Sequence, residues 1–600
     1  MKNGCVLVGI LLSITVFNFN VAISQTPPVW QDYVDAYTNG TQAILPDYSY
    51  SGYHFSEEEI PDVSSWTYFN VTHYGAIADD AGYDDAAIQA AIDAAEASGH
   101  PAVVFFPAGR FIVSSDNDIN NFIFINTDSI VLKGSGSGTG GTEIFMDKLR
   151  VRNGHWQFRF QPASTNTSTL TSLTEPAIRG DFSVTVASSA NLSIGQSIYI
   201  YHKSEEFASA HYGNLALNET EWTRLFGGDG GMILHECHII ESIEGNKVRF
   251  KNPIQTDLPT LSKPYYIRNL KTIEEVGIED ILFTSDWVNY RDEFVHHQDD
   301  TVDYAWNAVQ FKYVENAWIR NCEFRDWTQV ADIRESIGVT IENCMLTGKR
   351  GHASFITRRN YGVLVKDCID NANHHHGPGT GYSGVSTVYL RYKMSENQSI
   401  DCHSGSPITT LMDDIDGGDF HTNGGPWVSY PHHGRYLTFW NFIHKKSTPV
   451  DYNFWSVGIR KPATYAEPYF IGFQPTNTVT MTGEGLNEMQ GIEVEPKSLF
   501  EAQLALRLTP TSTDNSAENT EQVLNIYPNP FSSNFQIHAS SLSHLESLAM
   551  YSIDGREVAV KVKNNGNRLL IQPASDLSTG IYFIKIKING RVGNYSIIKK

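Results

Sequence analysis

The sequence predicts an all-β solenoid, a right-handed parallel β-helix, and two observations lead to this prediction. A phrase in which apolar and polar residues alternate before Asn-Cys or Asp-Cys recurs four times, and its cysteines are 22, 24 and 34 residues apart. Alternation is typical of strands, and a repeat near this length is typical of a chain that lays one strand on the last at each turn. We expect the cysteines to stack as small buried residues, with disulfide pairing as the alternative. They are Cys322, Cys344, Cys368 and Cys402.

An N-terminal cap is predicted before the first coils. Residues 68–80 (YFNVTHYGAIADD) lead into residues 83–95 (YDDAAIQAAIDAA), and residues 103–111 (VVFFPAGRF) follow. These segments resemble the cap of pectate-lyase-like β-helix proteins, and the resemblance implies the fold but leaves the activity open, since that superfamily contains lyases, hydrolases, epimerases and phage tail spikes. Asp84 or Asp85 is expected to cap a helix that closes the end of the solenoid. The apolar face of that helix is Ile88, Ala91, Ile92 and Ala95.

Length and charge bound the class of protein. The chain is 41% hydrophobic, as in globular proteins, and its 600 residues are more than one hydrophobic core needs. We therefore expect one large domain with at least one appendage. The formal net charge of −23 argues against nucleic acid as a partner, because such a partner needs an extended basic face. We expect a monomer.

The chain begins with the pattern of a secretory signal peptide, placed at residues 1–25. Lys2 precedes an apolar run at 6–17, and small residues follow that run. The run is too short to span a bilayer and no other stretch is long enough, so we expect no membrane span once the signal is removed.

The C-terminal segment differs from the solenoid in its pattern. It opens with VLNIYPNPF at 523–531 and continues through LSTGIYFIK at 577–585. It closely resembles the C-terminal sorting domain of the type IX secretion system of the Bacteroidetes. The resemblance implies a β-sandwich-like module, the type IX machinery as a partner, and export through the periplasm and outer membrane to the cell surface or the medium.

The other boundaries follow from changes of rhythm along the chain. Between 175 and 260 the coil pattern lapses into alternating strands and turns, which predicts a small antiparallel β insertion. The predicted domains are the cap and first coils at 26–174, the insertion at 175–260, the remaining coils with the candidate site at 261–508, a linker at 509–522 and the sorting domain at 523–600.

Most of the candidate chemistry lies in the third quarter of the chain. Nine of the 21 histidines fall between His352 and His444, and residues 345–366 contain five cations but no Asp or Glu. This inversion of charge on an acidic chain predicts a patch that meets an anion. A polysaccharide lyase acting on uronic acids needs a cation, a base and an acid in such a place. The candidate catalytic residues are His352, Arg358, Arg359, His376, His421 and Arg435. The candidate substrate-binding residues are Lys349, Arg350, His403, Asp419, Trp427 and Tyr430.

Two alternatives to a lyase on an acidic polysaccharide stay open. A glycoside hydrolase on the same fold needs two carboxylates, and Asp413, Asp414, Asp416 and Asp419 supply candidates. A non-catalytic glycan-binding solenoid is the other alternative. The same carboxylates are compatible with Ca²⁺, although their spacing does not match an EF-hand loop. Three adjacent histidines, His374–His376, cannot all face one way on a strand, which argues against one metal site that uses all three.

Overall fold

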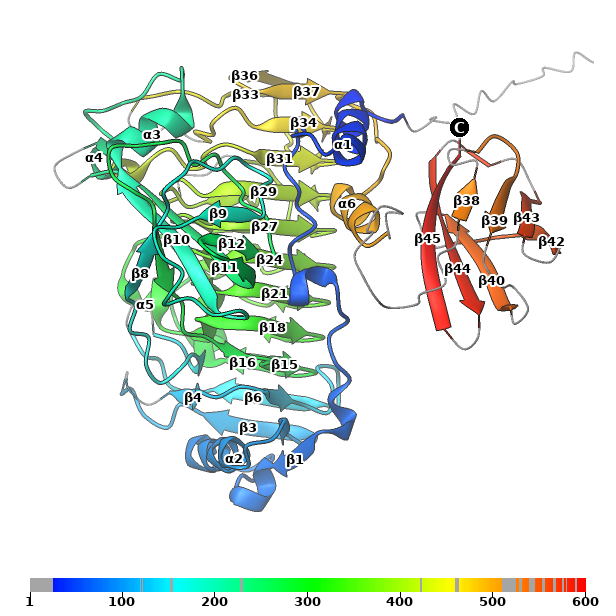
Figure 1. The fold of residues 1–600 in the computed structure, drawn as a ribbon. Coiled ribbons are helices and arrows are strands. Elements are labelled where there is room, and N and C mark those ends of the chain that lie inside the picture. Colours follow the sequence, from blue (N-terminus) through cyan, green and yellow to red (C-terminus); the bar gives the residue numbers. More distant parts are fainter. Residues whose placement is uncertain are drawn as a thin grey trace, which may run out of the picture.

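The computed structural model describes residues 25–509, apart from 119, 121, 152–154, 227–229, 421–423 and 459–462, together with parts of 525–599. The predicted signal peptide up to residue 24 and nearly all of the predicted linker lie outside the described residues. The described chain winds into a parallel β-helix with three long faces, which confirms the predicted fold class (Figure 1). Short helical turns are η1 (Tyr53–Ser56), η2 (Val63–Ser65), η3 (Val71–Tyr74), η4 (Asp286–Asn289) and η5 (Trp427–Ser429).

Successive coils add strands to three parallel sheets. Sheet 1 contains β1 (Thr67–Asn70), β2 (Ala102–Phe105), β5 (Ile130–Lys133), β14 (Ile273–Glu274), β15 (Gly277–Glu279), β18 (Val314–Arg320), β21 (Ile337–Glu342), β24 (Tyr361–Lys366), β27 (Val385–Leu390), β29 (Ile408–Asp413), β31 (Leu437–Trp440), β34 (Tyr469–Ile471) and β37 (Leu486–Glu488). Sheet 2 contains β3 (Gly109–Val113), β6 (Thr142–Met146), β16 (Leu282–Ser285), β19 (Glu323–Arg325), β22 (Met345–Thr347) and β25 (Ile369–Asp370), and this face continues with β30 (Asp416–Gly417), β32 (Ile443–His444) and β35 (Gln474–Pro475). Sheet 3 contains β4 (Ile123–Ile125), β7 (Phe158–Phe160), β17 (Asn307–Lys312), β20 (Gln329–Arg334), β23 (Ala353–Arg358), β26 (Gly379–Gly381) and β28 (Asp401–Cys402), and β33 (Val450–Asn453) pairs β36 (Val479–Thr482) in the last coils.

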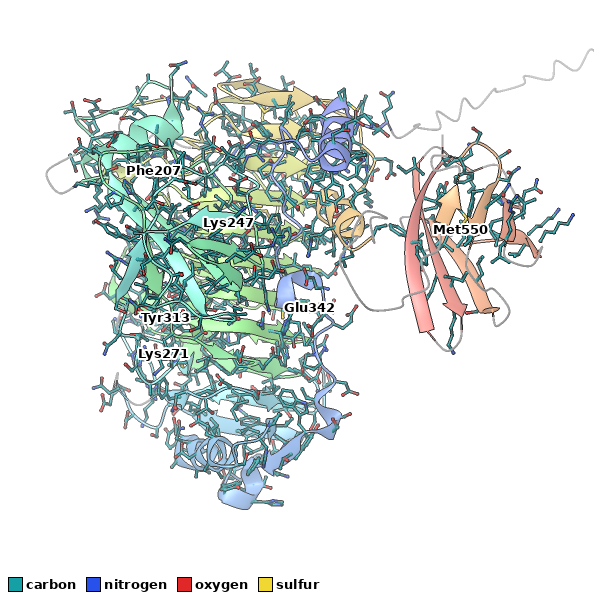
Figure 2. All side chains as sticks on the ribbon, viewed as in Figure 1. Phe207, Lys247, Lys271, Tyr313, Glu342 and Met550 are labelled. Carbon is teal, nitrogen blue, oxygen red and sulfur yellow. The ribbon has the colours of Figure 1, made fainter. Side chains whose placement is uncertain are left out.

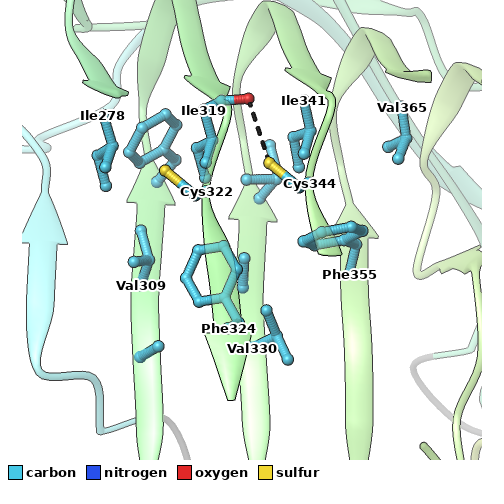
Figure 3. Close-up of a cluster of buried hydrophobic side chains, with 14 of the residues drawn as sticks. Ile278, Val309, Ile319, Cys322, Phe324, Val330, Ile341, Cys344, Phe355 and Val365 are labelled. Atoms are coloured by element: carbon cyan, nitrogen blue, oxygen red, sulfur yellow. Dashed lines mark hydrogen bonds between the residues drawn. The ribbon is translucent and has the colours of Figure 1, made fainter. Parts of the chain in front are cut away.

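The Asn/Asp-Cys motif marks the turn from sheet 1 to sheet 2. Asn321, Asn343 and Asp367 have φ of 56°, 53° and 55°, and Asn and Asp adopt this left-handed conformation more readily than other non-glycine residues. The residue after each of them points into the core, so Cys322, Cys344 and Cys368 lie between apolar side chains of neighbouring coils. Figure 3 shows Cys322 and Cys344 in this position. All five cysteines that the structure describes are buried and free, as the ladder predicts.

The prediction that Cys402 continues this ladder is wrong. Cys402 lies in β28 of sheet 3, where it pairs with Thr380. The ladder position of that coil is filled by Tyr392, which follows Arg391 with φ of 49°. The step of 34 residues therefore joins two different sides of the solenoid, and alternation alone does not distinguish them.

Helix α2 (Asp85–Ala97) closes the N-terminal end of the solenoid, and its predicted apolar face is fully buried. The expected capping by Asp84 or Asp85 is not found, because neither side chain accepts a capping hydrogen bond from the helix. Asp84 instead accepts from the Ile112 amide at 2.9 Å, and Asp85 from the Ser114 amide at 2.8 Å. These carboxylates therefore tie the helix to β3.

The insertion is a six-stranded antiparallel sheet with its own apolar core. Its elements are β8 (Thr169–Ser172), β9 (Ser183–Thr185), β10 (Ser197–Ser204), α3 (Glu205–Tyr212), α4 (Thr223–Phe226), β11 (Met232–Glu244), β12 (Lys247–Phe250) and β13 (Tyr266–Asn269). This core contains Phe207, which is labelled in Figure 2. It also contains Tyr361, which begins a strand of sheet 1. The Ser383 hydroxyl donates to the Ile233 carbonyl at 2.7 Å. The insertion therefore covers the edge where sheet 3 turns into sheet 1.

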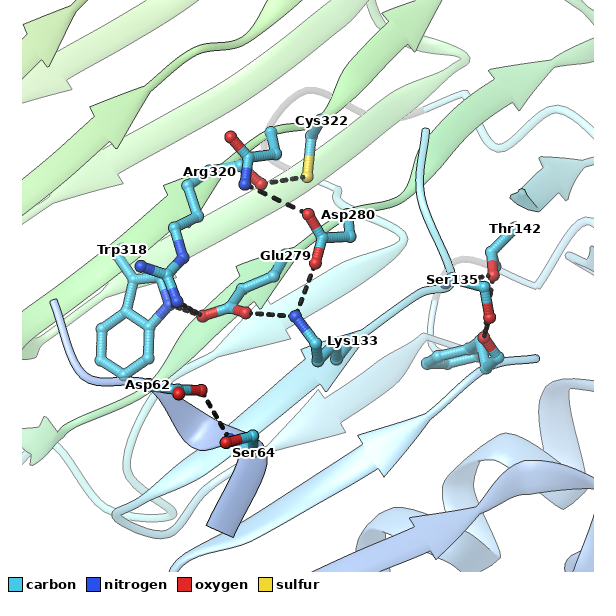
Figure 4. A network of polar contacts seen from close by, with 12 residues as sticks. Asp62, Ser64, Lys133, Ser135, Thr142, Glu279, Asp280, Trp318, Arg320 and Cys322 are labelled. Carbon is cyan, nitrogen blue, oxygen red and sulfur yellow. Dashed lines mark hydrogen bonds and ion pairs between the residues drawn. The ribbon is translucent and has the colours of Figure 1, made fainter. Parts of the chain in front are cut away.

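The outer face of sheet 1 carries ion pairs, and two helices from the N- and C-terminal parts of the β-helix domain cover it. Lys133 Nζ lies 2.7 Å from Glu279 and 2.5 Å from Asp280, and Glu279 also accepts from Arg320 at 2.7 Å and from Trp318 Nε1 at 2.9 Å (Figure 4). These cations are neutralised within the fold. The covering elements are α1 (Pro28–Asn39) and α6 (Leu499–Arg507).

Helix α6 lies against the outer face of sheet 1 rather than over the final coil (Figure 1). The Asp413 carboxylate holds its N-terminus, because it accepts from Ser498 Oγ at 2.7 Å, Leu499 N at 3.1 Å and Phe500 N at 2.8 Å. The C-terminal module is separate and consists of two four-stranded antiparallel sheets around a core that includes Met550 (Figures 1 and 2). Its strands are β38 (Asn525–Tyr527), β39 (Phe535–His538), β40 (Leu545–Ser552), β41 (Glu557–Val558), β42 (Val560–Asn564), β43 (Arg568–Pro573), β44 (Gly580–Ile588) and β45 (Arg591–Lys599).

Candidate active site

Histidine and aspartate side chains from three consecutive coils meet where sheet 3 begins. His352 lies just before β23, His376 just before β26, and Asp401 and His403 lie in and after β28. The parallel pairing of Ala353 with His376 and of Gly379 with Asp401 brings these coils side by side. The segment between η4 and α5 (Asp300–Tyr304) adds His296, and α5 itself adds Asp303. We call His296, Asp303, His352, His376, Asp401 and His403 the histidine cluster.

His376 is the central member of the histidine cluster. Its Nδ1 lies 3.2 Å from Asp401 Oδ2, and its Nε2 lies 3.2 Å from His296 Nε2. The same Asp401 oxygen lies 2.9 Å from His403 Nδ1. Because a carboxylate accepts, both imidazoles donate Nδ1–H to Asp401, and this fixes their tautomers with Nε2 unprotonated.

Burial and neighbouring charges set the protonation states in the cluster. Burial alone would raise the pKa of Asp401, but the imidazoles of His403 and His376 hold it well below its usual value. Burial lowers the pKa of His403 despite the adjacent carboxylate, so this imidazole is neutral at pH 7. Burial raises the pKa of Asp303, so the two carboxyl groups of the cluster are shifted in opposite directions.

A column of cations leads along sheet 3 towards the cluster. Lys312, Arg334 and Arg358 are in register on adjacent strands, and the next position in the column is Gly381. Parallel strands are about 4.8 Å apart, so the column presents a positive charge at each coil. The buried Asp332 pairs with Arg334 at 3.0 Å and with Arg358 at 3.3 Å, and these guanidiniums lower its pKa although burial opposes the shift.

Strand β26 places buried glycines between the cations and the cluster, and we call Gly379 and Gly381 the glycine floor. Its two outward positions are glycines, and a Cβ added to Gly381 would lie 2.9 Å from the Cβ of His403. Tyr382 stands beside this floor, with its ring 5.9 Å from the Arg358 guanidinium carbon and 6.0 Å from the His403 ring. A cation, a neutral imidazole held by a carboxylate, and a phenol therefore lie close together beside the glycine floor.

The structure brings together four of the predicted site residues and places the others elsewhere. His352, His376, His403 and Arg358 lie in or beside the cluster. Arg359 pairs with Glu335 at 3.3 Å on the turn after β23. Arg350 is exposed and lies over the Phe294 ring at 5.7 Å, and His421 lies outside the described residues.

The remaining candidates have structural partners. Lys349 Nζ donates to three backbone carbonyls between η4 and residue 292 and lies 4.1 Å from the Trp287 ring centroid. Arg435 donates to the last two carbonyls of α3, and Asp419 pairs with Lys446. Trp427 packs on the insertion core, and Tyr430 is buried in it. None of these five side chains belongs to the histidine cluster.

Sequence reasoning missed His296, Asp401, Asp332 and Tyr382. Asp401 precedes Cys402, so the repeated phrase predicts that it lies at a turn of the cysteine ladder and not at a functional site. Asp332 stands in the apolar phrase QVADIR, where an outward carboxylate inside a strand is a usable signal. His296 comes from 80 residues before its partner His376, and no periodicity links the two.

Three family profiles match separate parts of the chain. Residues 68–185 match the family described as rhamnogalacturonase A/epimerase, pectate lyase-like, and residues 373–513 match a domain of unknown function (DUF4955). Residues 525–600 match the secretion system C-terminal sorting domain. The described chain is therefore a parallel β-helix, with a pectate-lyase-like profile match near its N-terminus and a sorting domain at its C-terminus. The sorting domain marks it for export to the cell surface or the medium.

Individual relatives of this β-helix share only part of it. Over 70 residues it is 41% identical to mannuronan C5-epimerase AlgE3 and 40% identical to mannuronan C5-epimerase AlgE4, both of Azotobacter vinelandii. That stretch is 12% of this chain and 4% and 12% of those two proteins, so the chain spans a small fraction of their length.

Solved structures cover more of the chain at low identity. The A-module of Azotobacter vinelandii mannuronan C-5 epimerase AlgE6 is 13% identical with a TM-score of 0.27, and the match covers 71% of this chain and 91% of that one. The tailspike gp49 of Pseudomonas phage LKA1 is 13% identical with a TM-score of 0.31, and covers 88% and 98%. At this level of similarity neither structure bears on activity. None of the helices described in this β-helix and its sorting domain is long and apolar enough to cross a membrane.

Proposed function

We propose that this protein is an exported lyase that cleaves a uronic-acid polysaccharide by β-elimination on the outer face of sheet 3. The observation that carries the proposal is the order of groups along the solenoid axis. Arg334 and Arg358, held by Asp332, are followed across the glycine floor by the pair formed by His403 and Asp401. A polymer with one carboxylate per sugar matches a column with one cation per coil.

Each group has a defined part in the elimination. Arg358 pairs with the carboxylate of the bound sugar, which withdraws charge from C5 and makes its proton more acidic. Neutral His403 takes the C5 proton at Nε2, and Asp401 stabilises the resulting imidazolium through Nδ1–H. The C5–H electron pair forms the C4–C5 double bond, the C4–O bond breaks, and Tyr382 protonates the departing oxygen.

The partial relatives support a polysaccharide substrate. The two epimerases that share 70 residues with this chain are named for action at C5 of mannuronan, the ring position at which we place proton removal. The pectate-lyase-like profile matches residues 68–185 of this chain, before the histidine cluster, so it supports the class of ligand and not the roles of individual residues.

Glycoside hydrolysis is the second candidate, and the opposite pKa shifts of Asp303 and Asp401 favour it, because hydrolases use one protonated and one ionised carboxyl group. The acidic residues between 413 and 419 do not add to this support. Asp414 pairs with Lys497 and Asp416 with Lys445, while Asp413 holds α6 and Asp419 pairs with Lys446.

The deciding experiment incubates the full chain with a panel of uronic-acid polysaccharides while ultraviolet absorbance and new reducing ends are recorded. We expect both signals to rise on one substrate, and His403→Gln to lower the rate about 100-fold or more. The exposed His100, far along the chain from the cluster, supplies the control His100→Gln, which should keep the parent rate. Reducing ends without absorbance would replace elimination by hydrolysis, and a full rate in His403→Gln would refute the assigned base.

A further inference from the structure

We propose that His296, His352 and His376 form a binding site for a transition-metal cation of the zinc class. Each of the three side chains offers a ring nitrogen, and these nitrogens all lie within 4.8 Å of one another. The inference rests on this geometry and holds whether or not the protein is a lyase.

The spacing of the nitrogens is compatible with coordination as well as with a hydrogen bond between the rings. His296 Nε2 and His376 Nε2 are 3.2 Å apart. Two imidazole nitrogens bound to one tetrahedral Zn²⁺ at about 2.0–2.1 Å are separated by about 3.3–3.4 Å, so this pair already stands near its liganded separation. The third nitrogen lies within 4.8 Å of the other two, so a shift of at most about 1.5 Å completes the same geometry.

The second nitrogen of each buried histidine is anchored in the way that metal-binding histidines are anchored. His376 Nδ1 faces the Asp401 carboxylate at 3.2 Å, and His352 Nδ1 faces the Asp303 carbonyl at 3.2 Å. Both contacts fix Nδ1–H as the donor and leave the Nε2 lone pair for a cation. His352 is only 5% exposed, and its Nε2 has no hydrogen-bond partner among the described residues. A buried nitrogen of this kind costs free energy unless a ligand satisfies it.

His296 closes the site from outside the solenoid. It is only partly buried, in the segment between η4 and α5, and its ring stacks on His297 at 3.8 Å and on His375 at 3.9 Å between centroids. Stacking on these two rings orients the imidazole, and the external segment provides the movement that completes coordination. Of the three adjacent histidines, only His376 offers a ligand to this site.

The donor set selects the class of cation. Three imidazoles suit Zn²⁺, Co²⁺, Ni²⁺ or Cu²⁺, whereas Ca²⁺ and Mg²⁺ take oxygen ligands. Three protein ligands leave a fourth position for water or an oxygen of a bound glycan. The alternative group His376, Asp401 and His403 also lies within 4.8 Å, but there the two Nδ1 atoms already make hydrogen-bond contacts to the carboxylate at 3.2 and 2.9 Å.

The test titrates Co²⁺ and Zn²⁺ into the full-length, chelator-treated protein, with visible absorption for Co²⁺ and calorimetry for Zn²⁺. We expect one equivalent of each, a tetrahedral Co²⁺ spectrum, and a higher melting temperature with Zn²⁺. His296→Ala should weaken binding at least 100-fold while the metal-free protein melts as the parent does, because His296 lies outside the solenoid. Asp401→Asn should weaken binding about 10–100-fold by releasing His376.

Two controls decide which nitrogens bind. His403→Gln should retain Zn²⁺ binding, and His100→Ala should match the parent. Loss of binding in His403→Gln with retention in His296→Ala would overturn the assignment in favour of the alternative group. Absence of a stoichiometric site in the parent protein would overturn the proposal altogether.

Discussion

The sharpest prediction concerns Asp332, which touches no substrate in our proposal but holds both cations that do. Its side chain is fully buried, accepts from Gln310 Nε2 at 2.9 Å, and pairs with Arg334 and Arg358. Asp332→Asn keeps the shape and the contact with Gln310 but removes the charge. The two guanidiniums then repel each other without a shared counterion.

The magnitude follows from the exposure of the partners. Removing one partner of a fully buried ion pair lowers the free energy of unfolding by about 3–5 kcal/mol. The side chains of Arg334 and Arg358 are 30% and 26% exposed, so water replaces part of the lost interaction, and we expect the free energy of unfolding to fall by about 2–3 kcal/mol. Because the freed guanidiniums leave the position that meets the carboxylate, KM should rise roughly tenfold, about 1.4 kcal/mol, with a smaller change in kcat.

The assay measures KM and kcat on the substrate identified by absorbance, together with the denaturation midpoint. Asp367→Asn is the matched control, since Asp367 binds Arg391 at 2.6 and 3.0 Å outside sheet 3 and Asn keeps its left-handed turn. It should leave KM unchanged. An unchanged KM in Asp332→Asn, with only the stability lost, would show that the cation column does not bind the polymer.

Three further predictions use other parts of the molecule. Burial raises the pKa of Glu315 from 4.5 to about 7, so the stability that its protonated form contributes is full below about pH 4.5 and is lost as the pH rises through 7. The free energy of unfolding of Glu315→Gln should therefore exceed that of the parent by about 3 kcal/mol at about pH 8 and equal it at about pH 4, as measured by denaturant titration; equal values at both pH values would contradict this. Gly381→Ala should lower kcat at least tenfold, because its Cβ would lie 2.9 Å from the Cβ of His403 and displace that residue, and the same contact should lower the melting temperature; full activity would mean that this position of His403 is not needed. Asp303→Asn should keep the rate of elimination within about tenfold of the parent rate, whereas a fall of 100-fold or more in the rate at which reducing ends form would favour hydrolysis.

The solenoid, its cap and its sorting domain could be predicted from the sequence because each depends on local patterns. Alternation selects strands, Asn or Asp supplies the left-handed turn, and the cysteine after it fills the core. The prediction failed at Asp401-Cys402, which has the same residue types as the motif at the turn from sheet 1 to sheet 2 but lies in sheet 3. Alternation does not show on which side of the solenoid a strand lies.

The composition of the site was decided only by the tertiary structure. A run of cations and histidines located the right coils, yet Lys349 and Arg435 are engaged by backbone carbonyls, while His403 and Arg358 face the glycine floor. His296 reaches His376 across 80 residues of chain. Strand periodicity is a property of neighbours in sequence, whereas a site on a solenoid is assembled across coils and from a segment outside them, so its members are set by stacking register and loop reach.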